Sequence, residues 1–272
     1  GAYTDSVTNP NTASNTFSWT ADVTAPTLTS VSLTSNNANN ALSIDGNTIS
    51  LAFTASETIG TPTCDIEFTA GEDATNAESI TNPSGNNWLC TVVAHDSDAD
   101  GAVVFSLGFS DSAGNAGVAV TATTDSSGVT HDDTVPTLTT IVEATSGTGE
   151  ANDGDDVSLT ITASEAIQQP VCTFSSGGAG MANTVSYSGS GTSWVATIEV
   201  ADSDTNGDVT FSCAFSDLAG NAGVADTTPN SGDVEVENTH PTVSSFSFND
   251  VAMKAGDTPT LTLTFSEAVT GF

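Results

Sequence analysis

The sequence predicts an all-β protein built from tandem antiparallel β-sandwiches, arranged as beads on a string. Apolar and polar residues alternate with a period of two in many short runs, such as Ile49–Phe53 and Phe105–Phe109. Gly, Asn and Asp separate these runs, which is the composition of turns between strands. Similar segments recur at spacings of 110 and then 105 residues, and no segment has a sustained helical period. About seven short strands per repeat are typical of a two-sheet sandwich.

Three motifs recur in the same order: a Thr-x-Pro-Thr linker, a strand that ends in Ser-Glu, and an Asp-x-Ala-Gly-Asn-Ala-Gly hairpin. They occupy residues 24–27, 134–137 and 239–242; 51–57, 159–165 and 261–267; and 111–117 and 217–223, respectively. The repetition divides the chain into the last strand of a preceding repeat over 1–21, full repeats over 22–132 and 133–238, and the start of a further repeat over 239–272. We therefore expect a segment of a longer array. Donation of the 1–21 strand to another copy of the chain is the alternative.

These motifs resemble the bacterial Ig-like (Big-type) repeats of large extracellular adhesins and surface proteins. The Pro-Thr linker, the Ala-Ser-Glu after the second strand and the Asp-x-Ala-Gly-Asn-Ala-Gly hairpin carry the resemblance, and residues 261–272 match best. The resemblance covers nearly the whole chain. It implies Ig-like sandwiches and an extracellular location at the cell surface. The cysteines depart from the family pattern, because such repeats often have none.

The charge balance excludes several classes of function. The chain has 34 acidic residues, one lysine (Lys254), no arginine and a formal net charge of −33. Nucleic-acid binding needs basic residues that neutralise phosphates, and an anionic membrane would repel this chain. No apolar stretch approaches the roughly 18 residues of a membrane-spanning helix. Divalent cations, high external salt or wide spacing must offset the repulsion between carboxylates. A merely solvated acidic surface, as in a marine or halophilic organism, is the simpler interpretation.

Each full repeat contains two cysteines, and the period-two pattern places all four on core-facing positions. Four cysteines allow three connectivities. We favour Cys64–Cys90 and Cys172–Cys213, because each repeat then closes its own bridge, and two pairs of buried thiols are the alternative. Disulfides imply an oxidising compartment.

Two acidic loops match the first half of a calcium-binding loop, D-x-[DN]-x-[DN]-G. They are Asp96–Gly101 and Asp202–Gly207. Neither has a glutamate at the twelfth position, so neither is an EF-hand. An Asp- and Gly-rich turn between two strands is the alternative interpretation.

Strand direction predicts further clustering of carboxylates, because alternating strands bring the linker, the connection after the second strand and the last hairpin to one pole of a sandwich. We expect a first junction with Asp22, Glu57 and Asp111, a second with Asp96, Asp98, Asp100, Asp132, Asp133, Glu165 and Asp217, and a third with Asp153, Asp155, Asp202, Asp204, Glu237 and Glu267. The family resemblance implies Ca²⁺ at such junctions. Asp111 and Asp217 have the alternative role of capping a tight hairpin.

Nothing in the sequence has the pattern of a catalytic site. His95, His131 and His240 have no nucleophile at a useful spacing, and we expect them to be solvated residues of linkers and loops. No G-x-S-x-G motif or phosphate-binding glycine loop occurs. The alternation of apolar residues around the three tryptophans favours core positions over platforms for sugar rings, for Trp19, Trp88 and Trp194 alike.

The sequence therefore predicts a non-enzymatic extracellular segment of an adhesin-like protein: a stalk, a filament or a surface-layer (S-layer) segment. Calcium at the junctions and disulfides within the repeats would stiffen it. The expected partners are neighbouring repeats of the same chain, other copies in a filament or layer, and an unknown surface ligand. The alternative function is a ligand- or carbohydrate-binding adhesion module.

Overall fold

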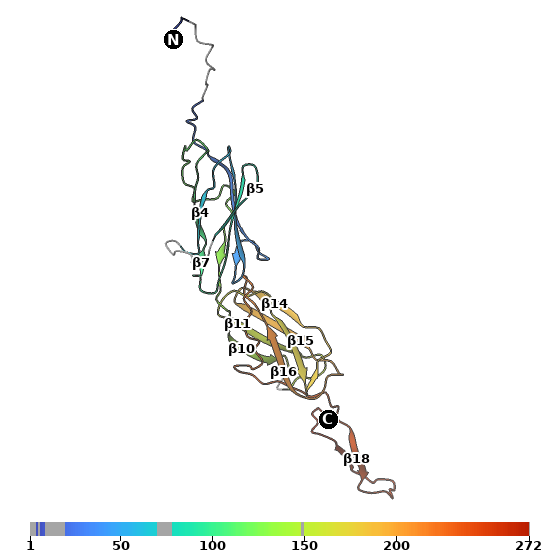
Figure 1. Ribbon diagram of the computed structural model, residues 1–272. Coiled ribbons are helices and arrows are strands. Elements are labelled where there is room, and N and C mark those ends of the chain that lie inside the picture. Colours follow the sequence, from blue (N-terminus) through green and yellow to red (C-terminus); the bar gives the residue numbers. More distant parts are fainter. Residues whose placement is uncertain (1–3, 5, 9–19, 70–77, 148–149, 272) are drawn as a thin grey trace. The chain divides into compact units, whose positions relative to one another are not determined.

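The computed structural model describes residues 4, 6–8, 20–69, 78–147 and 150–271, and the regular elements formed by these residues are all strands (Figure 1). The chain divides into two compact units, which we call unit 1 (Gly1–Thr134) and unit 2 (Val135–Phe272). Within the described residues, no helix is long and apolar enough to cross a membrane. The expected strand within residues 1–21 and the side chain of Trp19 fall largely outside the described part of the chain.

The described residues of unit 1 form nine strands: β1 (Leu28–Ser35), β2 (Leu42–Ser43), β3 (Thr48–Ala55), β4 (Thr63–Glu67), β5 (Ser79–Ser84), β6 (Asn87–Val93), β7 (Gly101–Ala102), β8 (Val104–Gly108) and β9 (Thr130–His131). One sheet has the order β1-β3-β6-β5, a second pairs β4 with β8, and β2, β9 and β7 form a short third sheet. With β2 and β7 set aside, the first, second, fifth and fourth strands form one layer, and the third and sixth form the other. This is the strand order of an Ig-like sandwich.

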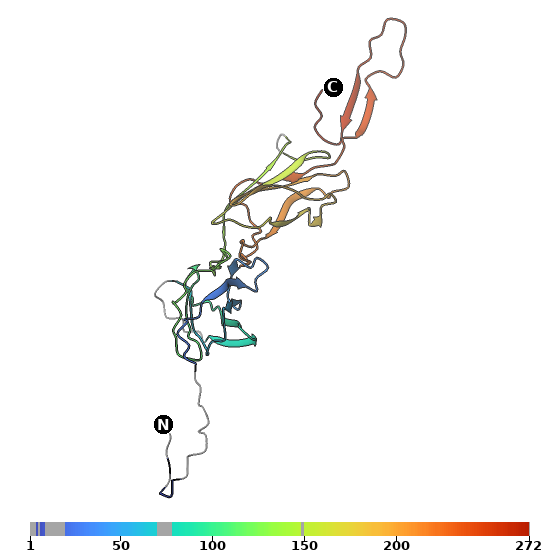
Figure 2. The same ribbon diagram turned by 90° about the horizontal axis from the view of Figure 1, so that it is seen from above.

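The described residues of unit 2 form ten strands: β10 (Leu138–Thr145), β11 (Asp156–Ala163), β12 (Val171–Ser176), β13 (Ala179–Gly180), β14 (Ser186–Ser190), β15 (Ser193–Glu199), β16 (Gly207–Ala214), β17 (Glu235–Val236), β18 (Val243–Phe248) and β19 (Leu261–Phe265). The sheets β10-β11-β15-β14 and β13-β12-β16-β17 repeat the sandwich order of unit 1. The last two strands pair as a separate antiparallel hairpin, which Figure 2 shows as two adjacent arrows.

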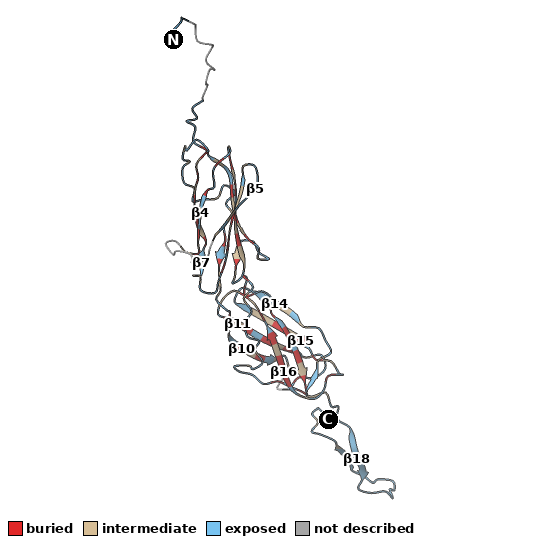
Figure 3. Cartoon of the chain, viewed as in Figure 1, coloured by how far each residue is buried: buried red, intermediate tan, exposed pale blue. Residues whose placement is uncertain are grey.

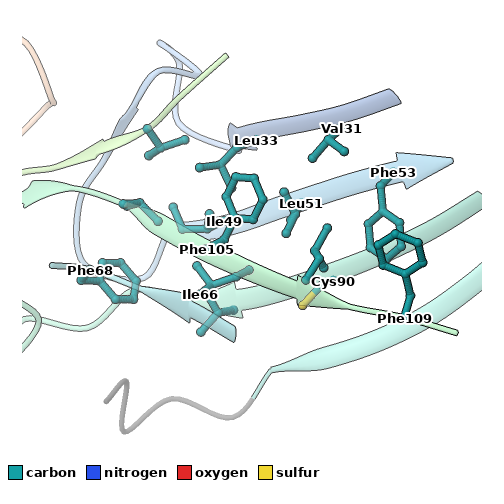
Figure 4. Packing of buried hydrophobic residues seen from close by; sticks show 14 of the residues in the cluster. Val31, Leu33, Ile49, Leu51, Phe53, Ile66, Phe68, Cys90, Phe105 and Phe109 are labelled. Atoms are coloured by element: carbon teal, nitrogen blue, oxygen red, sulfur yellow. The ribbon is translucent and has the colours of Figure 1, made fainter. Parts of the chain in front are cut away.

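Alternating burial explains why these segments form strands. In β3, Ile49, Leu51 and Phe53 are buried, while the residues between them face outward. Figure 4 shows these side chains packed between the two layers of unit 1. Burying one such side chain contributes about 1.5–3 kcal/mol. Unit 2 has its own core built in the same way, so the predicted all-β fold and its period of two are confirmed.

The hairpin of β18 and β19 shows what happens without a second layer. All six residues of β18 are exposed, as the pale colour of this strand in Figure 3 shows. Among the described residues, no second sheet covers its apolar side chains Phe246 and Phe248. The same alternation therefore produces burial only where a facing sheet is present.

Both predicted disulfides are present. Cys64–Cys90 joins β4 to β6, which belong to different sheets, with 6.6 Å between the Cα atoms. Cys172–Cys213 joins directly opposed residues of the neighbouring strands β12 and β16, with 4.1 Å between the Cα atoms. Cys90 and Cys213 are fully buried and Cys172 nearly so, whereas Cys64 is half-buried at the edge of the core.

The two repeats thus anchor their bridges at equivalent cysteines and choose different partners. Cys64 lies opposite Leu107 in the strand pair of unit 1, as Cys172 lies opposite Cys213 in unit 2. One bridge crosses the sandwich and the other runs within a sheet. The two tryptophans of the described residues, Trp88 and Trp194, pack partly buried against the two cores, as predicted.

Candidate metal centre

Three carboxylates of unit 1 meet at one pole of its sandwich. Asp22 precedes β1, Glu57 follows β3 and Asp111 follows β8, and one oxygen of each lies within 4.8 Å of the others. The antiparallel order of these strands brings the three points together, although up to 89 residues separate them in sequence. This cluster, the linker triad, contains the residues expected at the first junction.

Asp111 is held in a fixed orientation by its own hairpin. Its Oδ1 accepts hydrogen bonds from the backbone N–H groups of Ala113 (2.9 Å) and Asn115 (2.8 Å), and its Oδ2 accepts one from Nδ2 of Asn115 (2.7 Å). The side-chain amide of Asn115, followed by the backbone N–H groups of the hairpin, lowers the pKa of Asp111. Asp111 therefore does cap the hairpin. Carboxylates that bind metal ions commonly accept hydrogen bonds as well, so this role is compatible with a cation site.

The same hairpin also holds the linker. Nδ2 of Asn115 donates to the backbone carbonyl of Asp22 (3.1 Å), and Oδ1 of Asp22 accepts from the N–H of Thr24 (3.0 Å). Asp22 is exposed and Glu57 is half-buried. Each carboxylate of the linker triad thus comes from a different connection, and hydrogen bonds orient two of them, Asp22 and Asp111.

The charge of the linker triad favours a cation. Two unit charges about 4 Å apart repel by about 1 kcal/mol in bulk water and about 4 kcal/mol near a protein surface. The whole sequence has one lysine and no arginine, so basic side chains are almost absent as partners. Hard divalent cations such as Ca²⁺ prefer carboxylate and carbonyl oxygens, which are the groups that this pole presents.

Unit 2 contains the counterparts of Asp111 and Glu57, which are Asp217 and Glu165. Asp217 is almost completely buried; its Oδ1 accepts from the N–H groups of Gly220 (2.6 Å) and Asn221 (2.9 Å), and its Oδ2 from Nδ2 of Asn221 (2.8 Å). Glu165 follows β11 as Glu57 follows β3. The sequence counterpart of Asp22 is Asp132, two residues before the second Thr-x-Pro-Thr motif.

The acidic loop Asp96–Gly101 uses its oxygens differently from the calcium loop that its sequence resembles. Oδ2 of Asp98 accepts from the N–H of His95 (2.7 Å), and the two oxygens of Asp100 accept from the N–H of Asp133 (2.7 Å) and from Oγ1 of Thr134 (2.6 Å). Among the described residues, no cluster of three ligand atoms within 4.8 Å includes Asp96, Asp98 or Asp100. The loop binds its own backbone and the linker.

Asp133 is directed into unit 1. Its Oδ2 lies 2.9 Å from Nε2 of His131, and its Oδ1 accepts from the N–H of Asp45 (2.6 Å). His131 is completely buried, with its ring edge-on to that of Phe68 at 5.0 Å. The expectation of a solvated linker histidine was therefore wrong for His131. The alternation of Val129 and His131 was the sequence feature that indicated a core position.

Carboxylates of the second acidic loop and of the third expected junction also accept hydrogen bonds from nearby groups of unit 2. Asp204 is buried, and its two oxygens accept from the N–H groups of Ala182 (2.8 Å) and Ala201 (2.9 Å), whereas Asp202 is exposed. The hydroxyl and N–H of Thr239 lower the pKa of Glu237.

Three carboxylates of that expected junction, Asp153, Glu237 and Glu267, line one pocket of about 400 Å³ in unit 2. Oδ2 of Asp155 accepts from the N–H of Asn152 (3.0 Å), Asp153 is exposed and Glu267 follows β19. Within the described ranges, none of these residues, nor Asp202, Asp204 or Glu237, joins a three-ligand cluster.

We predict that Asp100 contributes to the fall in the free energy of unfolding of unit 1 at acidic pH. The N–H of Asp133, then the hydroxyl of Thr134, lower its pKa in the folded state below the ordinary 3.8. This stabilisation is present above the unfolded-state pKa and is lost as pH falls through the lower folded-state value. Asn206 is the equivalent residue of unit 2. In the Asp100→Asn variant, the unfolding free energy should fall less on acidification below pH 4 than in the wild type, and the difference should be less than about 1 kcal/mol.

Urea unfolding between pH 2 and pH 5 measures this effect. Asp96→Asn, in the same loop but without the bonds to Asp133 and Thr134, is the matched control and should keep the wild-type slope. Identical slopes for Asp100→Asn and the wild type would contradict the prediction.

Comparisons with known proteins show distant likenesses. No protein-family model and no curated protein matches this sequence. Similar solved structures include a three-domain titin fragment with glutamate-to-alanine substitutions (12% identity over 81% of this chain and 68% of that chain, TM-score 0.42). A marsupial T cell receptor is similar at 13% identity over 80% of this chain and 76% of that chain, with a TM-score of 0.41. The mouse nectin-like molecule 4 ectodomain is similar at 13% identity over 79% of this chain and 67% of that chain, with a TM-score of 0.31. The strand order described above, rather than these likenesses, establishes the Ig-like sandwich.

Proposed function

We propose that this chain is a non-enzymatic structural segment of an extracellular, adhesin-like surface protein, in a stalk, filament or surface layer. Two disulfides within its sandwiches support an oxidising, extracellular compartment. Ig-like repeats joined by short Pro-containing linkers suit a spacer, in which length and stiffness are the useful properties. The neighbouring repeats, and other copies of the chain, are the proposed partners.

The observation that carries this proposal is the linker triad. Asp22 belongs to the linker, whereas Glu57 and Asp111 belong to two connections of the sandwich. A Ca²⁺ ion bound by all three would fasten the linker to the pole of unit 1 and neutralise most of the local charge. By sequence, Asp132, Glu165 and Asp217 correspond to Asp22, Glu57 and Asp111. Calcium would therefore reduce bending at the linker that contains Asp22.

A calcium titration of the full chain tests this function. We predict that Ca²⁺ at ten times its dissociation constant raises the free energy of unfolding of unit 1 by about 1.4 kcal/mol. Glu57→Gln should abolish most of this gain, because the linker triad loses one charged ligand. The measurement is urea unfolding with Ca²⁺ and with a chelator. Small-angle scattering of the same samples measures the maximum dimension, which should increase with calcium.

Glu199→Gln is the control, because it removes the same charge from an exposed position at the end of β15. It should keep the calcium response of the wild type. Equal responses of Glu57→Gln and the wild type would exclude the linker triad as the site, and a maximum dimension insensitive to calcium would exclude stiffening.

A further inference from the structure

Unit 2 contains a pocket of about 490 Å³ beside β10, β16 and β17, which we call the acidic pocket. Five acidic residues line it: Glu143, Glu150, Asp208, Asp233 and Glu235. Apolar atoms of Val209, Phe211 and Val234 complete part of the wall. This volume falls in the range of small-molecule sites, about 300–1,000 Å³.

Glu143 is the unusual member of this pocket. Its side chain lies on the core-facing side of β10, paired in register with Leu159, and only 4% of it is exposed. Its Oε1 is buried without a hydrogen-bond partner among the described residues. The backbone N–H of Val234 donates a hydrogen bond to this carboxyl group, so Oε1 is the atom left unsatisfied, which costs about 1–3 kcal/mol. A ligand with a hydrogen-bond donor in this pocket would satisfy Oε1 of Glu143.

The same position in unit 1 shows that the fold does not need an acid there. Leu33 pairs with Leu51 as Glu143 pairs with Leu159, and Figure 4 shows Leu33 packed in the core of unit 1. In the hairpin of the last repeat, Phe248 holds this position and pairs with Leu261. The carboxylate is therefore specific to unit 2.

The other four acids of the pocket are specific to unit 2 as well. Strand register and backbone hydrogen bonds align Glu150, Asp208, Asp233 and Glu235 with Leu42, Ala102, Gly128 and Thr130 of unit 1, respectively. None of the four equivalents carries a charge. All five acids of the pocket therefore occupy positions that are uncharged in unit 1, so they are not part of an acidic surface common to both repeats.

We propose that the acidic pocket binds an organic cation with a primary aliphatic ammonium group, supplied by a free diamine or by a lysine side chain of another protein. An ammonium has three N–H donors, which suit several convergent carboxylates, and charge-assisted bonds of this kind are strong. Its methylene chain would pack against Val209, Phe211 and Val234. Lys254, the one lysine of the sequence, is not among the residues that line the pocket.

A bare metal ion suits the pocket less well. Calcium ligands lie about 2.3–2.6 Å from the ion, so ligand oxygens on opposite sides are about 5 Å apart. Among the described residues, the pocket acids do not form a cluster of three oxygens within 4.8 Å. An ammonium on a flexible chain spans this wider space.

Binding should depend on pH through Glu143. Burial first, and then the charge of Asp233, raise the pKa of Glu143 to about 7. The carboxylates of Glu150, Asp208, Asp233 and Glu235 face the same pocket, and an ammonium favours the ionised form of each. The affinity should therefore rise as pH increases through 7, where Glu143 loses its proton.

Isothermal titration calorimetry of the full chain at pH 8 and near-physiological salt tests the proposal, since salt screens non-specific attraction to the acidic surface. The probes are 1,5-diaminopentane and Nα-acetyl-lysine amide. We expect saturable one-to-one binding that Glu143→Gln weakens about tenfold or more, because a charge-assisted bond is lost. Glu143→Leu, which restores the residue type of unit 1, should weaken it at least as much. The control Glu199→Gln makes the same charge change outside the pocket and should bind within about twofold of wild type.

The outcomes separate the alternatives. Tight binding of the diamine alone assigns a free diamine, whereas comparable binding of the lysine amide assigns a lysine side chain. Equal effects of Glu143→Gln and Glu199→Gln, or no saturable binding of either probe, would overturn the proposal. Binding of Ca²⁺ that depends on Glu143, with no binding of either amine, would also overturn it. Glu57→Gln should leave amine binding unchanged, so this test is independent of the linker triad.

Discussion

Replacing Cys172 and Cys213 together by alanine should lower the free energy of unfolding of unit 2 by about 4 kcal/mol. The bridge closes a loop with a sequence separation of 41 residues, and a loop of this length corresponds to about 4 kcal/mol in the chain-entropy description of disulfides. The loss is large because single domains are stable by only about 5–15 kcal/mol. Urea unfolding of the full chain, with tryptophan fluorescence as the readout, measures it.

Unit 1 offers a matched control for the position of the bridge. Cys90→Ala alone breaks the bridge to Cys64, which should destabilise unit 1 by a similar amount. Adding Leu107→Cys places a cysteine directly opposite Cys64, as Cys213 lies opposite Cys172. The double variant then matches unit 2 at both positions, since Ala196 is the equivalent of Cys90. It should regain stability under oxidising conditions and lose it on reduction. A Cys172→Ala/Cys213→Ala protein as stable as wild type would contradict the prediction.

Glu143→Leu should stabilise unit 2 at pH 8, in the absence of an amine ligand, by roughly 2–3 kcal/mol more than at pH 4. The pKa of Glu143 is about 7 in the folded protein, above its ordinary 4.5, with burial as the main cause. A raised pKa means that the folded state holds a proton which the unfolded state has lost. The stability linked to this proton is fully present below pH 4.5 and is lost as pH rises through 7. Leucine has no such proton, so the variant lacks this loss.

Urea unfolding between pH 4 and pH 8 measures this difference, and Glu143→Gln should show the same flattened profile without the added apolar contact. Glu199→Gln, which removes an exposed carboxylate, should follow the wild-type profile. A gain from Glu143→Leu that is the same at pH 4 and pH 8 would show that Glu143 is not destabilised by ionisation.

Sequence reasoning predicted the parts that depend on local periodicity and chain direction. The alternation in Ile49–Phe53 indicates a strand with one buried face, and alternating strand directions bring Asp22, Glu57 and Asp111 to one pole. The pairing of cysteines within each repeat followed from the repeat boundaries. These features need no knowledge of individual side-chain orientations, because strand geometry alone imposes them.

In the acidic loops, the sequence pattern did not predict the partners of the aspartate side chains. Asp96, Asp98 and Asp100 have the spacing of a calcium loop, but aspartate oxygens accept equally well from nearby backbone N–H groups. In the folded chain Asp98 binds the N–H of His95, and Asp100 binds the linker. Asp133 pairs with the buried His131. The choice between a cation and a backbone donor depends on local geometry, which spacing alone does not encode.

The sequence by itself predicted the class of fold, the disulfide within each sandwich and the proximity of the three carboxylates of the linker triad. The tertiary structure alone decided how each carboxylate is used. It places Asp133 beside the buried His131 and Glu143 in the wall of the acidic pocket, at a position where unit 1 has Leu33. The physical reason is that a carboxylate is stabilised or destabilised by the donors, charges and solvent within a few ångströms, and in a sandwich those neighbours come from strands distant in sequence.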